Sequence, residues 1–174
     1  MNSENILVNI WRGIVVILSI GMLYWFNNLN QEQIKFLLDI YKNSVEVFFG
    51  NWHWYNSLDN YYVGDYYIIS ERCLGLNIIV LIFGLCGVMS IKFYKGFKRL
   101  FCIAVCACAA VVLGVFANLI RLLSSVLFTS YGTFAMIHTV IGIIIYLSVL
   151  IICYDVFNKM NSNSEGGNLN EEHF

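Results

Sequence analysis

The chain has 174 residues, of which 59% are hydrophobic and 12% are charged, and its net charge is −1. A typical soluble domain carries about a quarter charged residues, so this composition excludes an ordinary soluble fold and indicates that lipid is the main solvent. A near-neutral charge without a basic stripe also excludes an electrostatic nucleic-acid surface, and we expect no nucleic acid among the partners.

Four apolar stretches, 8–26, 74–91, 101–120 and 134–154, are each long enough for a spanning helix, which needs about 20 residues. The sequence therefore predicts an all-α, polytopic membrane helix bundle of about four spans. We expect one transmembrane domain over residues 1–157 and a disordered cytoplasmic tail, rich in Asn, Ser and Glu, over 158–174. Because Trp25, Phe26 and Asn27 do not form a small-residue cleavage site, the first stretch is expected to remain as a helix.

The link between the second and third stretches holds the densest basic cluster of the chain, which consists of Lys92, Lys95, Lys98 and Arg99. Short loops rich in Lys and Arg stay in the cytoplasm, so we expect this link and both termini to lie inside. The segment 27–72 then faces outward. The sequence thus predicts a multi-pass protein of the cell membrane whose second span begins at the outer face.

The outer segment carries two patterns. Apolar residues recur at steps of three and four over 34–49, which predicts an amphipathic helix that either lies on the membrane or caps the bundle. Aromatic side chains that favour the headgroup region follow: Trp52, Trp54, Tyr55, Tyr61, Tyr62, Tyr66 and Tyr67. The Tyr, Ile and Ser content of 65–71 predicts a short extended stretch that leads into the second span.

Three polar residues are predicted to lie at one depth. Cys73, Arg121 and His138 stand about 17 to 22 residues from the inner ends of their helices, which places them about 25 to 33 Å above the inner face. Ionisable residues in a span usually face the bundle, so we expect Arg121 and His138 to point inward. Asn118 and Asn77 lie one helical turn from Arg121 and Cys73, where they can supply hydrogen bonds on the same helix faces.

Small residues within the spans are interpreted as packing residues. The glycines that let neighbouring helices approach closely are Gly75, Gly114 and Gly142. Cys102, Cys106 and Cys108 form a CxxxCxC run, but no histidine or carboxylate stands beside it in the sequence. We therefore interpret these cysteines as small hydrophobic residues rather than as a metal or redox site, and we expect no metal and no cofactor.

Each of the three level residues also has a structural interpretation. Cys73 could be an inert thiol, Arg121 could extend to lipid headgroups, and His138 could hydrogen-bond between helices. Together, a thiol, an imidazole and a guanidinium supply the nucleophile, the base and the cation that thiol-based acyl transfer needs. A helix that begins at Cys73 would also place the thiol at the positive end of the backbone dipole.

Three short runs carry a family resemblance. They are ERCLGL from Glu71 to Leu76, NLIR from Asn118 to Arg121, and His138 with a glycine one turn later. Over about residues 65–145 the chain resembles the exosortase/archaeosortase family of membrane cysteine transpeptidases, and its shortness resembles compact members such as exosortase K.

The resemblance implies an enzyme, a cysteine-type peptidase or transpeptidase that acts at the outer face of the membrane. Cys73 would be the nucleophile, His138 the proton acceptor and donor, and Arg121 the stabiliser of the tetrahedral intermediate or of the substrate. Asn118, Asn77 and Glu71 complete the candidate site as supporting residues. The implied substrates are secreted proteins with a carboxyl-terminal sorting signal and a transmembrane helix, and an unknown acceptor resolves the thioester.

The sequence also departs from the family pattern. Leu74 follows the cysteine where Cys-Ser-Gly is common, and larger members have more than four spans, so the subtype and the substrate stay open. An alternative is a non-enzymatic, small-molecule-binding subunit of a membrane transporter that holds an anionic ligand through Arg121. A thiol-disulfide carrier would need a second outer cysteine, and the predicted topology places none near Cys73.

Overall fold

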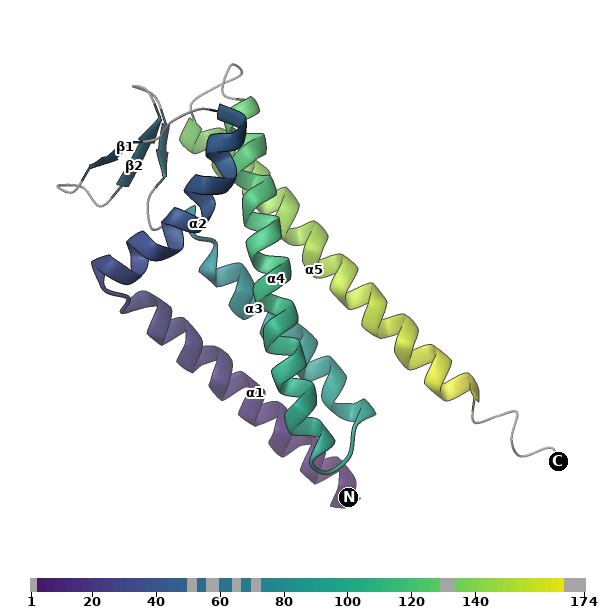
Figure 1. Cartoon of the computed structure of the whole chain (residues 1–174). Coiled ribbons are helices and arrows are strands. Elements are labelled where there is room, and N and C mark those ends of the chain that lie inside the picture. The colour runs from purple at the N-terminus through teal and green to yellow at the C-terminus, as the bar shows by residue number, and fades with distance from the viewer. Residues whose placement is uncertain are drawn as a thin grey trace.

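The computed structural model describes residues 3–49, 53–55, 60–63, 67–69, 73–128 and 134–167 (Figure 1). Four of its helices are long and apolar enough to cross a membrane: Ser3–Asn27, Leu76–Phe93, Lys98–Ser125 and Met136–Met160. Each overlaps one predicted stretch. The prediction of an all-α bundle with about four spans, the architecture of a multi-pass membrane protein, is therefore confirmed.

The helices run in chain order from one end of the bundle to the other and back. They are α1 (Ser3–Asn27), α2 (Gln31–Phe49), α3 (Leu76–Ser90), the short 3₁₀ helix η2 (Ile91–Phe93), α4 (Lys98–Leu127) and α5 (Phe134–Gly167). Figure 1 shows the N-terminus, the α3–α4 link and the last turns of α5 at one end of the bundle, and α2 at the opposite end. This arrangement brings the start of α3 and the end of α4 together.

The outer segment adds a small antiparallel sheet to the helical bundle. Its strands are β1 (His53–Tyr55), β2 (Asn60–Val63) and β3 (Tyr67–Ile69), in the order β1-β2-β3. Trp54 pairs with Tyr61, and Tyr62 pairs with Ile68. The strand β3 confirms the predicted extended stretch before the second span. The side chains of the predicted aromatic segment, and all of Trp52 and Tyr66, lie outside the described residues.

The helix α3 lies at the centre of the bundle because its sequence is apolar on every face. Ile78, Ile82 and Phe83 are at most 2% exposed, and they pack with Val15 of α1 and with buried residues of α4 and α5. A helix that is hydrophobic all round has to be buried in protein or in lipid. Here the other spans supply the protein surroundings.

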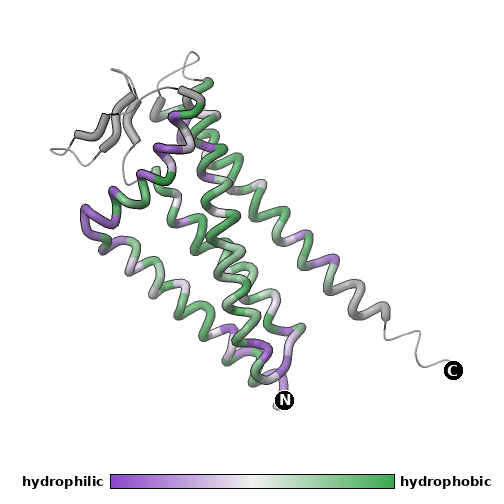
Figure 2. Tube along the Cα trace, in the orientation of Figure 1, coloured by the Kyte–Doolittle hydropathy of each residue, from purple (hydrophilic) through white to green (hydrophobic). Residues whose placement is uncertain are grey.

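The other spans present apolar side chains outward. Ile17 of α1, Val112 of α4 and Ile152 of α5 are 69%, 67% and 61% exposed. Figure 2 shows that hydrophobic residues follow each span and that hydrophilic residues gather near the ends. An apolar surface of this extent suits contact with lipid tails rather than with water.

The sharp turn between α1 and α2 is fixed by reciprocal capping. The Asn30 amide donates to Gln33 Oε1 at 3.0 Å, and the Gln33 amide donates to Asn30 Oδ1 at 2.9 Å. Such pairs satisfy two backbone donors at a helix start. The turn directs the predicted amphipathic helix across the end of the bundle, where Leu38 and Tyr41 are buried. Of the two predicted placements, α2 therefore caps the bundle.

The predicted packing role holds for two of the three cysteines in the CxxxCxC run. Cys102 and Cys106 are buried on α4 and contact the Ser90 hydroxyl at 3.2 and 3.3 Å. Cys108 is exposed instead, because two residues turn an α-helix by about 200° and carry the side chain to the opposite face.

The predicted disordered tail is shorter than expected. The helix α5 continues to Gly167, so residues 158–167 are helical, and 168–174 lie outside the described residues. Polar composition alone suggested disorder, but extending an existing helix costs much less than nucleating a new one.

We predict that Gly114→Ala destabilises the bundle whereas Gly13→Ala does not. A Cβ at Gly114 of α4 would overlap the side chain of Ile79 on α3 and lie 3.3 Å from its Cα, but a Cβ at Gly13 of α1 would meet nothing within 4 Å. Overpacking of this kind costs about 1–3 kcal/mol, and the α1 substitution should gain a little helix propensity. Thermal unfolding in detergent measures both, and equal effects would contradict the close α3–α4 approach.

Candidate functional site

Cys73 lies immediately before α3 at the end of the bundle that α2 covers. Its side chain is 6% exposed and belongs to a buried apolar cluster with Leu38 and Tyr41 of α2 and Leu122 of α4. Its carbonyl oxygen accepts a hydrogen bond of 2.5 Å from Asn118 Nδ2. A side chain of α4 therefore fixes the backbone that carries the thiol.

The predicted helix start at Cys73 is wrong by three residues. The helix α3 begins at Leu76, and its N-cap is Gly75, which has the left-handed φ of 66°. A Cβ at Gly75 would lie 2.6 Å from Cγ of Asn118. Glycine therefore permits both the backbone turn and the close approach of α4, and the position of Cys73 depends on this turn rather than on the end of a helix.

Arg121 of α4 is held by neutral partners. Its Nε donates to the His138 carbonyl oxygen at 3.3 Å, and one terminal nitrogen donates to Tyr146 Oη at 2.6 Å and to Asn118 Oδ1 at 3.5 Å. Its guanidinium carbon also lies 5.2 Å from the centre of the Tyr146 ring. Within the described ranges, no carboxylate forms an ion pair with Arg121, so its positive charge is oriented but not neutralised.

His138 of α5 is 7% exposed, and Ser125 of α4 orients its ring. Ser125 Oγ donates to the Arg121 carbonyl oxygen at 2.6 Å and lies 3.0 Å from His138 Nδ1. A hydroxyl group has a single proton, so Nδ1 is the donor in the second contact. This tautomer leaves the lone pair of the imidazole on Nε2.

Gly142 makes room for the arginine on the surface of α5. A Cβ at this position would lie 2.7 Å from Arg121 Nε and 3.3 Å from Cζ. The predicted close approach at Gly142 is therefore correct, and the glycine admits a functional side chain as well as a helix. Any larger residue would displace the guanidinium from His138.

Two tyrosines join the site without having been predicted. Tyr146 Oη donates to Asn118 Oδ1 at 3.0 Å, and Tyr41 Oη donates to the Leu74 carbonyl oxygen at 3.0 Å. Burial raises the pKa of the Tyr41 phenol above its usual value of 10.0, which keeps the donating hydroxyl neutral. Helical spacing could have identified Tyr146, which lies two turns after His138, and Ser125, which lies one turn after Arg121.

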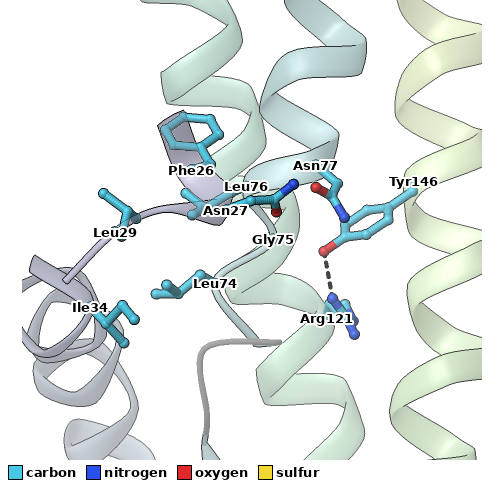
Figure 3. A pocket seen from close by; sticks show the side chains of 10 residues that line it. All are labelled: Phe26, Asn27, Leu29, Ile34, Leu74, Gly75, Leu76, Asn77, Arg121 and Tyr146. Carbon is cyan, nitrogen blue, oxygen red and sulfur yellow. Dashed lines mark hydrogen bonds between the residues drawn. The ribbon is translucent and has the colours of Figure 1, made fainter. Parts of the chain in front are cut away.

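A cavity of about 440 Å³ opens beside these residues (Figure 3). Arg121 and Tyr146 line one side, and 74–77 at the start of α3 line another. The end of α1 and Ile34 of α2 complete the lining. Cys73 and His138 are not among the lining residues, so they lie buried next to the cavity rather than in its wall.

The structure brings together most of the predicted site. Asn118 links Cys73 to Arg121, and Arg121 contacts His138, as the depth argument predicted. Asn77 lines the cavity. Glu71 lies outside the described residues. In the described part of the chain, no group of three His, Cys, Asp or Glu residues could hold a metal ion.

Comparison of the chain with protein-family models, with curated proteins and with solved structures finds no match. What the site can do is therefore inferred from its own geometry and chemistry. That geometry offers a buried thiol, an imidazole with a defined tautomer and a cation that borders a cavity.

We predict that Asn118→Leu lowers the free energy of unfolding by about 1–3 kcal/mol or more, because buried polar groups on three helices lose their partner. Leucine matches asparagine in size but cannot bind the Cys73 carbonyl, the Tyr146 hydroxyl or Arg121. The control is Asn77→Leu, since Asn77 is exposed and makes no side-chain hydrogen bond to any described residue. Denaturant unfolding in micelles compares the two variants, and equal losses would refute a central role for Asn118.

Proposed function

We propose that the chain is a membrane-embedded cysteine peptidase or transpeptidase that cleaves carboxyl-terminal sorting signals of secreted proteins at the outer face of the cell membrane. The observation that carries this proposal is the hydrogen-bonded convergence of Cys73, Arg121 and His138 through Asn118 and Ser125. These residue types match the three roles in thiol-based acyl transfer.

The proposed reaction begins with proton transfer from the Cys73 thiol to His138 Nε2, which holds the lone pair because Nδ1 donates to Ser125. The thiolate sulfur then attacks the carbonyl carbon of the scissile peptide bond. The C–N bond breaks, the leaving amine takes the proton from His138, and the acyl group stays on sulfur as a thioester. Attack by an acceptor amine or by water releases the acyl group and restores the thiol.

Arg121 supports this reaction through its charge and its fixed direction. A guanidinium group stays charged in proteins and donates from a planar fork. Tyr146 and the His138 carbonyl hold the fork, and no carboxylate among the described residues competes for it. In the proposal, Arg121 stabilises the negative oxygen of the tetrahedral intermediate, which is the largest electrostatic requirement of acyl transfer.

The cavity gives the proposed substrate a place beside the nucleophile. Its volume of about 440 Å³ lies within the range of about 300–1,000 Å³ that is usual for binding pockets. Leu74, which directly follows Cys73, is part of the lining. A substrate segment in this cavity would border Arg121 on one side and the chain that carries the thiol on the other.

A second candidate function is the binding of an anionic small molecule by a non-enzymatic transporter subunit. It is favoured by one observation: Arg121 and Tyr146 line the cavity, whereas Cys73 and His138 do not. In this function Arg121 would pair with the anion, and the thiol would be a packing residue.

We predict that Cys73→Ala abolishes processing of a co-expressed secreted reporter whose tail carries a short motif, an apolar helix and a basic cluster. Loss of a nucleophile lowers a rate by several orders of magnitude. Cys108→Ala is the matched control, because Cys108 is an exposed cysteine of α4 far along the helix from the site. Immunoblotting of the reporter measures cleavage, and hydroxylamine should release an accumulated thioester as the hydroxamate.

The same variants separate the two candidate functions. A transpeptidase loses processing in both Cys73→Ala and Arg121→Gln. A non-enzymatic binder tolerates Cys73→Ala and loses ligand only in Arg121→Gln. Normal reporter processing by Cys73→Ala would therefore overturn the enzymatic proposal.

We predict that the end of the bundle with Cys73 faces outward. In intact cells, a membrane-impermeant maleimide should label Glu32→Cys at the start of α2, and it should label Lys98→Cys only after lysis. Both positions are exposed at opposite ends of the bundle, and unsubstituted protein gives the background from native cysteines. The basic α3–α4 link motivates this direction, and the reverse labelling pattern would place the site inside.

A further inference from the structure

The opposite end of the bundle holds a second polar cavity, of about 700 Å³. Four cationic side chains line it: Arg12 of α1, Lys92 of η2, Lys95 of the α3–α4 link and Arg99 of α4. Glu4 is the one acidic residue in the lining. The cavity lies between segments far apart in the sequence, so the fold itself gathers this charge.

Arg99 is almost completely buried although it carries a full charge. It is 1% exposed, and its Nε donates to the Tyr94 carbonyl oxygen at 2.7 Å. One of its terminal nitrogens, Nη1, is buried and has no hydrogen-bond partner among the described residues. A buried donor without a partner is costly, and more so when it is charged. This nitrogen therefore requires an acceptor that the described part of the chain does not supply.

Arg12 presents the same requirement from the neighbouring helix. Its Nε is also buried without a partner in the described ranges, and the residue as a whole is half-buried. Two guanidinium groups from α1 and α4 thus offer unused donors at one cavity. Donors that converge from two helices suit one acceptor with several oxygens better than a single carbonyl group.

The carboxylate in the lining does not meet this requirement. Glu4 Oε1 lies 2.8 Å from Lys95 Nζ, in a pair that is largely exposed. Glu4 is within electrostatic reach of Arg99 but forms its ion pair with the lysine. After this pairing, both arginines remain without a carboxylate partner among the described residues.

We propose that this cavity binds a phosphate-bearing anion. A phosphate group offers several charged oxygens to diverging guanidinium donors, and arginine is the residue best suited to hold it. The cavity lies at the end of the bundle where α1 begins and α3 ends, at the depth where lipid headgroups meet the protein (Figure 1). An anionic phospholipid headgroup and free phosphate share this chemistry. This site is separate from the proposed catalytic site and does not depend on it.

The test uses the full chain in an uncharged detergent with three probes: a short-chain phosphatidylglycerol, a short-chain phosphatidylcholine and inorganic phosphate. A ligand that binds only the folded state raises the unfolding temperature in a saturable way. We expect saturation with phosphatidylglycerol or with phosphate and no response to phosphatidylcholine, whose choline cation opposes the basic lining.

Three variants tie the response to the cavity. Arg12→Gln should weaken the apparent affinity about tenfold or more, as expected for loss of a charge-assisted hydrogen bond. Arg12→Lys keeps the charge but loses the fork, so it should also weaken binding. Lys98→Gln removes one charge from an exposed residue that does not line the cavity, and its affinity should stay within about twofold of the wild type. Arg12 carries the test because replacing buried Arg99 could disturb folding.

The outcomes are distinct. A response to phosphatidylglycerol alone assigns a lipid headgroup site, a response to phosphate alone assigns a soluble phosphate site, and a response to both shows that the phosphate group suffices. The proposal is overturned if neither probe gives a saturable response. It is also overturned if Lys98→Gln weakens binding as much as Arg12→Gln, because the attraction would then be a diffuse effect of the basic end.

Discussion

The site depends on one amide side chain in a place where water cannot serve. Asn118 is fully buried, donates to the Cys73 carbonyl and accepts from Tyr146 and Arg121. Each partner comes from a different stretch of the chain, so this residue joins the approach to α3 with α4 and α5. In an apolar medium an unsatisfied polar group is expensive. The geometry of the thiol, the cation and the imidazole is therefore coupled through the hydrogen bonds of Asn118.

The same constraint explains where polar groups occur along the bundle. The middle of each span is apolar, and its exposed side chains suit lipid. Polar networks are confined to the two ends, and each end gathers arginine with different partners. At one end Arg121 is satisfied by neutral hydroxyl and carbonyl groups. At the other, Arg12 and Arg99 keep unused buried donors within the described part of the chain, so only the second end demands an external acceptor.

Helical rise was sufficient to predict which residues meet. Counting from the inner ends placed Cys73, Arg121 and His138 at one depth, and an ionisable residue in a span has to turn toward protein. The spans and the amphipathic helix followed from hydropathy and periodicity. Tyr41 could not be predicted in the same way, because its contact with Leu74 depends on how the α1–α2 turn directs α2 over the bundle. The start of α3 was missed because the backbone turn at Gly75 depends on the packing against Asn118.

The burial of Cys73 defines what the proposed enzyme has to do before chemistry. The thiol lies beneath Leu38 and Tyr41 of α2, while the cavity begins one residue later, at Leu74. Tyr41 also binds the Leu74 carbonyl, so the hydrogen bond that holds α2 in place lies at the boundary between the thiol and the cavity. Under the proposed function, a substrate reaches sulfur only when this contact shifts. A thiol that is covered until the substrate arrives also meets little water, and exclusion of water favours transfer of a thioester to an acceptor over its hydrolysis.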